Sequence, residues 1–257
     1  MLDGLFQAAL EDSRLREQSL SLKALESLAL STPTPVDAEL ALARTNRMRL
    51  IAEIKRASPS RGALAPIEDS AAQGLGYEQA GADAISVLTE RTGFSGSLED
   101  LSRVSAAATI PTLRKDFIST EYQLLEARAS GAAMALLILA WLDTSRFLEL
   151  KSFAEQIGLK VLVETHTRQE IDIASDSGAK LIGINTRDLE TFKTDIGLFE
   201  ELAGALPAES VRIAESSVKS VEDVRRYRDA GADAVLVGEA LVTGDYSKLI
   251  PEFISVA

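Results

Sequence analysis

Charged and amide side chains stand at the ends of short apolar runs at several places along this chain. Burial of such groups in a dry core is costly unless they have partners or line a polar cavity. Several of them meeting in one cavity could supply acids, bases and cations to a bound substrate. The candidate catalytic residues are Glu53, Lys55, Lys115, Glu164, Asn185 and Glu215.

The stretch 48–62, MRLIAEIKRASPSRG, carries two of these residues. Read as a strand, it places Glu53 and Lys55 on one face and apolar side chains on the opposite face. The residues that follow, ASPSRG, combine hydroxyls with proline and glycine, which form turns and can bind an anion. On its own, the stretch fits equally well a surface strand with an ordinary ion pair.

Two later positions favour an anion site. Ser216 and Ser217 follow one apolar run, Gly238 and Glu239 follow the next, and both pairs lead directly into expected helices. Backbone N–H groups at helix N-termini bind phosphate readily. In the alternative interpretation, Gly238 only permits a tight turn and Ser217 and Glu239 cap their helices, which is compatible with phosphate binding.

Two other residues stand next to the candidates. Arg187, beside Asn185, could reach a substrate carboxylate. His166, two residues after Glu164, could act as a base, but a histidine at the rim that begins the next helix is the simpler interpretation.

The elements that must position these residues alternate regularly from residue 48 onward. Strands are expected at 48–55, 84–88, 111–115, 133–139, 159–164, 180–185, 210–215 and 234–237, with amphipathic helices between them. Four helices end in a Gly that can take the left-handed cap conformation, namely Gly81, Gly131, Gly178 and Gly231.

This alternation predicts an α/β protein, a (β/α)8 barrel whose active site lies at the carboxyl ends of the strands. The rival, an open doubly wound sheet, usually has fewer strands and a Gly-rich fingerprint after its first strand, where this chain has KRASPSRG. Residues 1–47 show only helical spacing, with one or two helices in 1–30 and a short one near 37–44. We therefore expect one domain, 1–257, with an N-terminal helical extension at 1–47 and the barrel proper at 48–257.

Composition narrows the function classes. The absence of cysteine excludes disulfides and thiol catalysis, and a single histidine argues against a zinc or Ser-His-Asp site, so no metal is expected. A net charge of −12 argues against a nucleic-acid or anionic-membrane surface. The apolar run 132–142 is too short to span a bilayer, and the N-terminus lacks a signal peptide pattern. We expect a cytoplasmic protein, monomeric or a weak homo-oligomer.

Together, these motifs closely resemble the indole-3-glycerol phosphate synthase family of tryptophan biosynthesis. The matching blocks are 51–62, 80–90, 94–101, 113–118 with Tyr122 and Gln123, Glu164 in LVET, 183–192, 214–216 and 235–241. The resemblance implies conversion of a small sugar phosphate, 1-(2-carboxyphenylamino)-1-deoxyribulose 5-phosphate, into indole-3-glycerol phosphate, CO2 and water. It implies no metal or organic cofactor.

The residue types suit this chemistry. A cation must polarise or protonate the alkoxide that forms on ring closure, and Lys115 fits this need. Glu164 and Lys55 are suited to be the base and the acid of the dehydration. Which lysine serves which step is left open. Glu53 and Glu215 are expected to orient the lysines and bind sugar hydroxyls.

The resemblance also assigns the binding residues. Asn185 and Arg187 are expected to hold the benzoate ring and its carboxylate. The phosphate is assigned to Ser58 and to the backbone around Ser216, Ser217, Gly238 and Glu239.

Two positions depart from the family pattern. Ser217 stands where Gly is usual, so a left-handed backbone at this position would be strained. Thr186 stands where Asn or Ser is common, and its methyl group would shift a ligand hydrogen bond. We expect altered affinity rather than altered chemistry.

Three other functions are alternatives for a barrel with a charged mouth. Phosphoribosylanthranilate isomerase would need a Cys/Asp pair, which a chain without cysteine cannot supply. An aldolase-like enzyme would form a Schiff base on a lysine, which borohydride trapping would detect. A non-catalytic metabolite binder has no need for two lysines and three glutamates at fixed strand ends.

Overall fold

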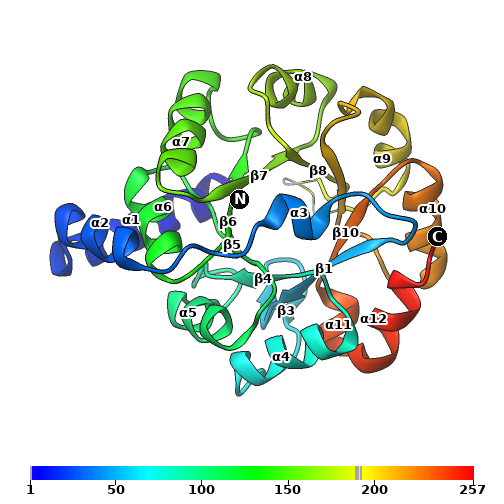
Figure 1. The fold of residues 1–257 in the computed structure, drawn as a ribbon, viewed down its shortest axis with the longest axis horizontal. Coiled ribbons are helices and arrows are strands. Elements are labelled where there is room, and N and C mark those ends of the chain that lie inside the picture. Colours follow the sequence, from blue (N-terminus) through cyan, green and yellow to red (C-terminus); the bar gives the residue numbers. More distant parts are fainter. Residues whose placement is uncertain (1, 189–190, 192) are drawn as a thin grey trace.

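The computed structural model describes residues 2–188, 191 and 193–257. Residues 189, 190 and 192, which belong to the family-like block 183–192, lie outside the described residues. Within that range, eight parallel strands close into a barrel in the order β1-β10-β9-β8-β7-β6-β5-β4 (Figure 1). The strands are β1 Arg49–Ile54, β4 Ala84–Leu88, β5 Thr112–Lys115, β6 Met134–Ile138, β7 Lys160–Thr165, β8 Leu181–Asn185, β9 Val211–Glu215 and β10 Ala234–Val237. The predicted (β/α)8 barrel is confirmed.

Helices follow the strands and surround the barrel (Figure 1). They are α4 Ser70–Ala80, α5 Leu98–Ala107, α6 Glu121–Ala129, α7 Thr144–Gln156, α8 Arg168–Asp176, α9 Gly197–Leu202, α10 Val221–Asp229, α11 Glu239–Thr243 and α12 Tyr246–Ile254. The last two replace the single helix expected from residue 239, because Asp245 accepts the N–H of Ser247 and begins a new helix after Gly244.

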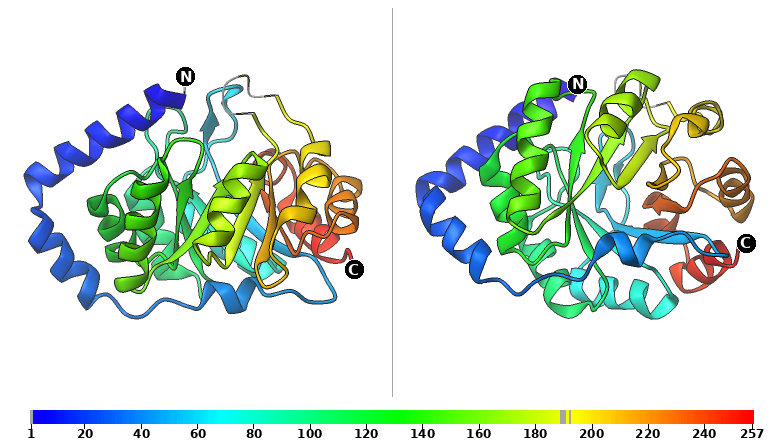
Figure 2. Two further views of the ribbon diagram at one scale, coloured as in Figure 1. Left: turned by 90° about the horizontal axis from the view of Figure 1, so that it is seen from above. Right: turned by 45° about the horizontal axis from the view of Figure 1, so that its top comes forward.

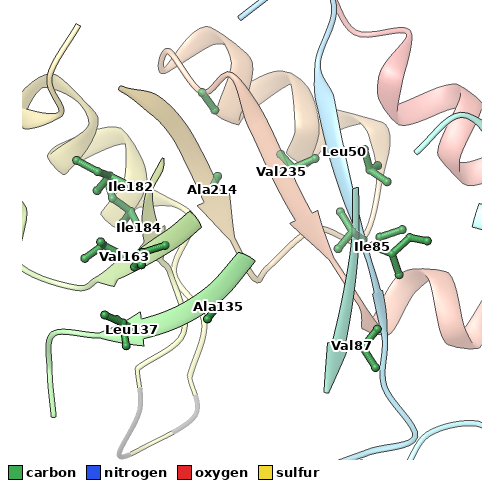
Figure 3. Packing of buried hydrophobic residues seen from close by; sticks show 14 of the residues in the cluster. Leu50, Ile85, Val87, Ala135, Leu137, Val163, Ile182, Ile184, Ala214 and Val235 are labelled. Carbon is green, nitrogen blue, oxygen red and sulfur yellow. The ribbon is translucent and has the colours of Figure 1, made fainter. Parts of the chain in front are cut away.

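Alternation along each strand creates two apolar layers. The outward side chains pack against the helices, and Figure 3 shows Leu50, Val163 and Val235 in this layer. The inward side chains fill the barrel and include Ile51, Ala84, Leu113, Met134, Leu136, Leu162, Leu181, Ile213, Ala234 and Leu236. The inner layer gives way to polar residues only where the strands end.

The N-terminal segment covers both ends of the inner layer. It contains α1 Leu2–Ser19, α2 Leu22–Ser31 and α3 Ala38–Leu42. Ala38 and Leu42 of α3 are fully buried in the same apolar cluster as the barrel interior, and Leu5 and Phe6 of α1 belong to this cluster too. In Figure 2, α1 and α2 extend along one side of the barrel before the chain crosses to α3.

The segment after β1 forms a small hairpin. Ala57–Ser58 (β2) pairs antiparallel with Gly62–Ala63 (β3), where the sequence predicted only a turn. Gly62 has φ +67°, a left-handed conformation that glycine adopts without strain. The hairpin rises at the same end of the barrel as the start of α1 (Figure 2).

A chain of buried charges joins α1 to β5. Arg114 points outward from β5, is fully buried, and pairs with Asp116 at 2.8 Å and with Glu126 of α6 at 3.1 Å. Glu126 also accepts from Arg16 of α1 at 2.9 Å, and Asp116 accepts from Thr89 at 2.6 Å. The four charges cancel, so every buried ion has a partner.

We expect Glu126→Ala to lower the free energy of unfolding by about 3 kcal/mol, because it removes one of the two carboxylates that compensate a fully buried guanidinium. Urea unfolding measures the change. Glu149→Ala removes a 60% exposed carboxylate that pairs with Arg146, and we expect it to cost less than about 1 kcal/mol. Equal losses in the two variants would contradict the prediction.

None of the helices in the described part of the chain is both long enough and apolar enough to cross a membrane.

Candidate active site

A cavity of about 400 Å³ opens at the carboxyl ends of the barrel strands. The strand alternation positions its polar residues, since Glu53, Lys115, Glu164 and Glu215 each stand two residues after an inward apolar side chain. The predicted residues that line the cavity are Glu53, Lys55, Lys115, Glu164, Asn185, Arg187, Glu215, Ser216, Ser217, Gly238 and Glu239.

Ser58 is the predicted site residue that does not line this cavity. It lies on β2 of the hairpin, and the adjoining residues Ser60 and Arg61 line the cavity instead. The hairpin thus contributes to the mouth through its tip.

Lys115 lies at the centre of the charged cluster. Its ammonium nitrogen is 3.1 Å from Glu164 Oε2 and 3.5 Å from Glu215 Oε2. Both carboxylates are 1% exposed and the ammonium is 16% exposed, so bulk water screens these pairs much less than it screens pairs on the surface. Three groups from β5, β7 and β9 therefore form one electrostatic unit.

Burial alone would lower the pKa of Lys115, but the carboxylates of Glu164 and Glu215 outweigh burial and raise it, so the amine stays charged. Burial alone would raise the pKa of Glu164, but the charges of Lys115 and His166 outweigh burial and lower it. Burial and repulsion from Glu164 raise the pKa of Glu215 to about 8. The cluster therefore contains a fixed cation, a carboxylate and a carboxyl group that can hold a proton at neutral pH.

Asn185 orients this cluster. Its Nδ2 donates to Glu164 Oε1 at 3.0 Å, while its Oδ1 accepts from the Ser216 hydroxyl at 2.8 Å and from the backbone N–H of Arg187 at 3.0 Å. Because every polar atom of the amide is engaged, the side chain has a single orientation. It fixes one oxygen of Glu164 and leaves the other for Lys115.

Two glycines leave room for the carboxylates. The side chain of Glu215 occupies the place where Gly183 would otherwise carry a Cβ. A Cβ on Gly238 would collide with the Glu53 carboxylate and lie 2.9 Å from Lys55 Nζ. The second pair is itself joined, with Lys55 Nζ 2.8 Å from Glu53 Oε1.

We expect Gly238→Ala to lower kcat/KM about 100-fold, because it must displace the Glu53 and Lys55 head groups from their positions in the cavity. Steady-state kinetics measures this loss of kcat/KM, and thermal unfolding checks that the variant is folded. Gly204→Ala adds the same methyl group with nothing within 4 Å and should leave the kinetics unchanged. Wild-type kinetics in Gly238→Ala would show that this close approach is not needed.

The loop after β9 has the strained backbone that the sequence predicted at Ser217. Ser216 has φ +72° and Ser217 has φ +66°, a region that costs about 1 kcal/mol or more for a residue with a Cβ. The hydroxyl of Ser217 lies 2.6 Å from Thr186 Oγ1, which in turn lies 3.0 Å from the Tyr227 hydroxyl. The two residues that depart from the family pattern therefore bond to each other, and this contact helps to hold the unusual conformation.

Sequence reasoning did not single out several other residues that line the cavity. They are Leu5, Ser60, Arg61, Leu88, Phe94, Asp116, Phe117, Leu136, Ile138, Thr194, Val218, Lys219, Leu236, Val237 and Ala240. Leu5 comes from α1, and nothing in its local pattern separates it from any other apolar helix residue. Arg61 pairs with Glu239 at 3.3 Å across the mouth, and its place three residues after Ser58, in the segment ASPSRG, was the available signal.

No group of three or more His, Asp and Glu side chains within the described ranges is arranged to hold a metal ion.

Comparison with known proteins identifies the family. The family model for indole-3-glycerol phosphate synthase matches residues 5–253. The chain belongs to this family. It is therefore an enzyme of the carbon–carbon lyase class, a carboxy-lyase of tryptophan biosynthesis, as the motifs predicted.

Relatives in this family align over nearly the whole chain. The indole-3-glycerol phosphate synthase of Leifsonia xyli subsp. xyli is 51% identical, covering 98% of this chain and 97% of the relative. That of Mycobacterium tuberculosis is 46% identical, covering 99% and 94%.

Solved structures with distant sequences share the fold. Thiamine phosphate pyrophosphorylase from Pyrococcus furiosus has a TM-score of 0.60 at 13% identity, covering 81% of this chain and 94% of its own. The N-acetylmannosamine-6-phosphate 2-epimerase from Clostridium perfringens has a TM-score of 0.61 at 17% identity, covering 83% and 94%. At such low identity these similarities concern the barrel alone.

Proposed function

We propose that the chain converts 1-(2-carboxyphenylamino)-1-deoxyribulose 5-phosphate into indole-3-glycerol phosphate, CO2 and water in this cavity. The observation that carries the proposal is the Lys115 ammonium between the carboxylates of Glu164 and Glu215, in a cavity that also reaches the helix start at Gly238. The family supports the choice of substrate, and the arrangement of charges supports the roles below.

Ring closure joins the carboxyl-bearing aromatic carbon to the ketose carbonyl carbon and moves negative charge onto the carbonyl oxygen. We assign the stabilisation of this oxygen to Lys115, whose pKa the neighbouring carboxylates raise, so that it acts as a permanent cation. Glu215, with a pKa of about 8, holds a proton that it can give to the alkoxide.

Loss of CO2 then restores the aromatic ring, and dehydration completes the indole. A base takes the anilino proton while an acid assists the departing hydroxide. Glu164 suits the base, because Lys115 and Asn185 fix its carboxylate. Lys55, 2.8 Å from Glu53, suits the acid, and Glu53 orients it.

The phosphate and the benzoate ring of the substrate are assigned to two different parts of the cavity lining. The phosphate is assigned to the N–H groups around Ser216, Ser217, Gly238 and Glu239, which line the cavity. The assignment of Ser58 rests on the family resemblance, since Ser58 lies on β2 outside the lining. Glu239 would contribute its backbone N–H, since its carboxylate pairs with Arg61. The benzoate ring and its carboxylate are assigned to Asn185 and Arg187, beside an apolar wall of Leu5, Phe94, Phe117, Leu136 and Ile138.

The decisive experiment incubates the pure protein with this substrate and follows indole fluorescence. We expect product formation without added metal or cofactor. A folded protein, judged by circular dichroism, that forms no indole would refute the proposal. Borohydride with substrate should leave no covalent lysine adduct, because the assigned steps contain no Schiff base.

A further inference from the structure

His166 is a partly buried residue that the proposed steps do not use. It is the single histidine of the chain, and it stands directly after β7, two residues beyond Glu164. Its side chain is 13% exposed and does not belong to the lining of the cavity. The sequence favoured a rim histidine that merely begins the next helix, but the structure places its ring between two carboxylates.

The two ring nitrogens face opposite partners. His166 Nε2 lies 3.5 Å from Glu164 Oε1, and His166 Nδ1 lies 3.6 Å from Glu170 Oε2 on α8. Neither ring nitrogen, among the described residues, has a hydrogen-bond partner that satisfies normal geometry. Both contacts are therefore ion-pair contacts, and their character depends on the charge of the ring.

The two protonation states of the ring fit these neighbours unequally. A neutral imidazole has one N–H and one lone pair, so one of its nitrogens would turn a lone pair toward a carboxylate oxygen. The imidazolium presents an N–H to both carboxylates and removes that repulsion. The geometry thus favours the charged ring.

We propose that His166 is a positioning residue which, as an imidazolium held by Glu170, keeps Glu164 ionised and directed at Lys115. It acts through Glu164 and does not touch the substrate. The inference rests on the proposed function where it concerns turnover, because Glu164 matters as the base of the dehydration.

The surrounding charges agree with this role. The groups that face the ring are Glu164 from β7, Glu170 from α8 and Glu215 from β9, with Lys115 of β5 beyond Glu164. Burial disfavours the charged ring, but the carboxylates of Glu170 and Glu164 outweigh burial and raise the pKa of His166. In turn, the imidazolium adds a second cation beside Glu164, near the Oε1 atom to which Asn185 donates, while Lys115 contacts Oε2.

Because the chain has one histidine, NMR reads its ring directly. We expect the full-length protein to titrate above the ordinary histidine value of about 6.5, with both nitrogens protonated below that midpoint. Glu170→Gln keeps an oxygen for the backbone N–H of His166, which Glu170 now accepts at 2.7 Å, and should lower the midpoint by about one pH unit. A wild-type midpoint at or below 6.5 would overturn the proposal.

Asp172→Asn is the matched control. It removes one carboxylate from the same helix, but Asp172 is 56% exposed and pairs with Arg168. We expect the His166 midpoint to stay unchanged. Equal shifts in the Glu170 and Asp172 variants would mean that the helix charge in general, and not the contact with the ring, controls the titration, and would also overturn the proposal.

Kinetics test the effect on Glu164. His166→Asn removes the cation, so we expect the acid limb of kcat/KM to move up by about one to two pH units, with kcat lowered more than KM is changed. His166→Lys should recover part of the wild-type profile because it restores a positive charge. An unshifted acid limb in a folded His166→Asn variant would refute the role. Inactivity of the wild type would instead refute the proposed function and leave the NMR result to decide the charge of the ring.

Discussion

Lys115→Ala is expected to lower kcat about 1000-fold while KM changes by a few-fold at most. In the proposed mechanism the ammonium stabilises the charge that develops on the ketose oxygen, and loss of one such preorganised group typically costs a factor of about 100 to 1000. Steady-state fluorescence assays, with single-turnover experiments to isolate the chemical step, measure the loss.

The same variant should fold with little loss of stability. Removing the ammonium leaves two buried carboxyl groups, but Glu215, with its pKa already raised to about 8, can remain protonated beside Glu164. Lys248→Ala is a matched control, because Lys248 is 77% exposed and pairs with Asp245 on the surface. Near-wild-type turnover of Lys115→Ala would exclude this lysine from the chemical steps.

Glu164→Gln should lower kcat by a factor of about 100 to 10,000, the range expected when a general base is replaced by an isosteric amide. The amide still accepts a hydrogen bond from Asn185, so the site should keep its shape. Exposed Glu209→Gln, at the other end of the barrel beside β9, serves as the control for the same chemical change.

The role of Glu164 as a base also predicts how kcat/KM of the wild type changes with pH. The pKa of Glu164 is lowered, so the base is present above that value and is lost only as pH falls through it. We expect kcat/KM of the wild type to stay near its maximal value at mildly acidic pH. A Glu164→Gln variant that retained both the wild-type rate and the wild-type acid limb would assign the base to another residue.

Much of the barrel could be predicted because its signals are local. Period-two alternation places Leu162 inward and Glu164 on the same face, and the same rule holds for Leu113 and Lys115. The Gly residues at four helix ends have positive φ angles as expected, for example +105° at Gly81. Each of these features depends on a few neighbouring residues.

Other contacts could not be predicted from the sequence, because they join segments that are far apart in the chain. Arg114 has the pattern of an outward core position, but its partner Glu126 comes from α6, and Arg16 of α1 pairs with that same carboxylate. No spacing rule predicts such pairs. The contacts of His166 are different, since Glu164 and Glu170 lie only two and four residues away, and here the turn from β7 into α8 decides that both carboxylates face the ring.

The sequence by itself determined the barrel, the family and the set of charged residues at the strand ends, since each follows from side-chain periodicity and short motifs. Only the tertiary structure decided which charges from different strands pair with one another. Lys115 pairs with Glu164 and Glu215 from two other strands, whereas the pair of Lys55 with Glu53 is local and was one interpretation that the sequence allowed. Distance and burial set these interactions, and both arise when the closed sheet brings strands from opposite ends of the chain to one mouth.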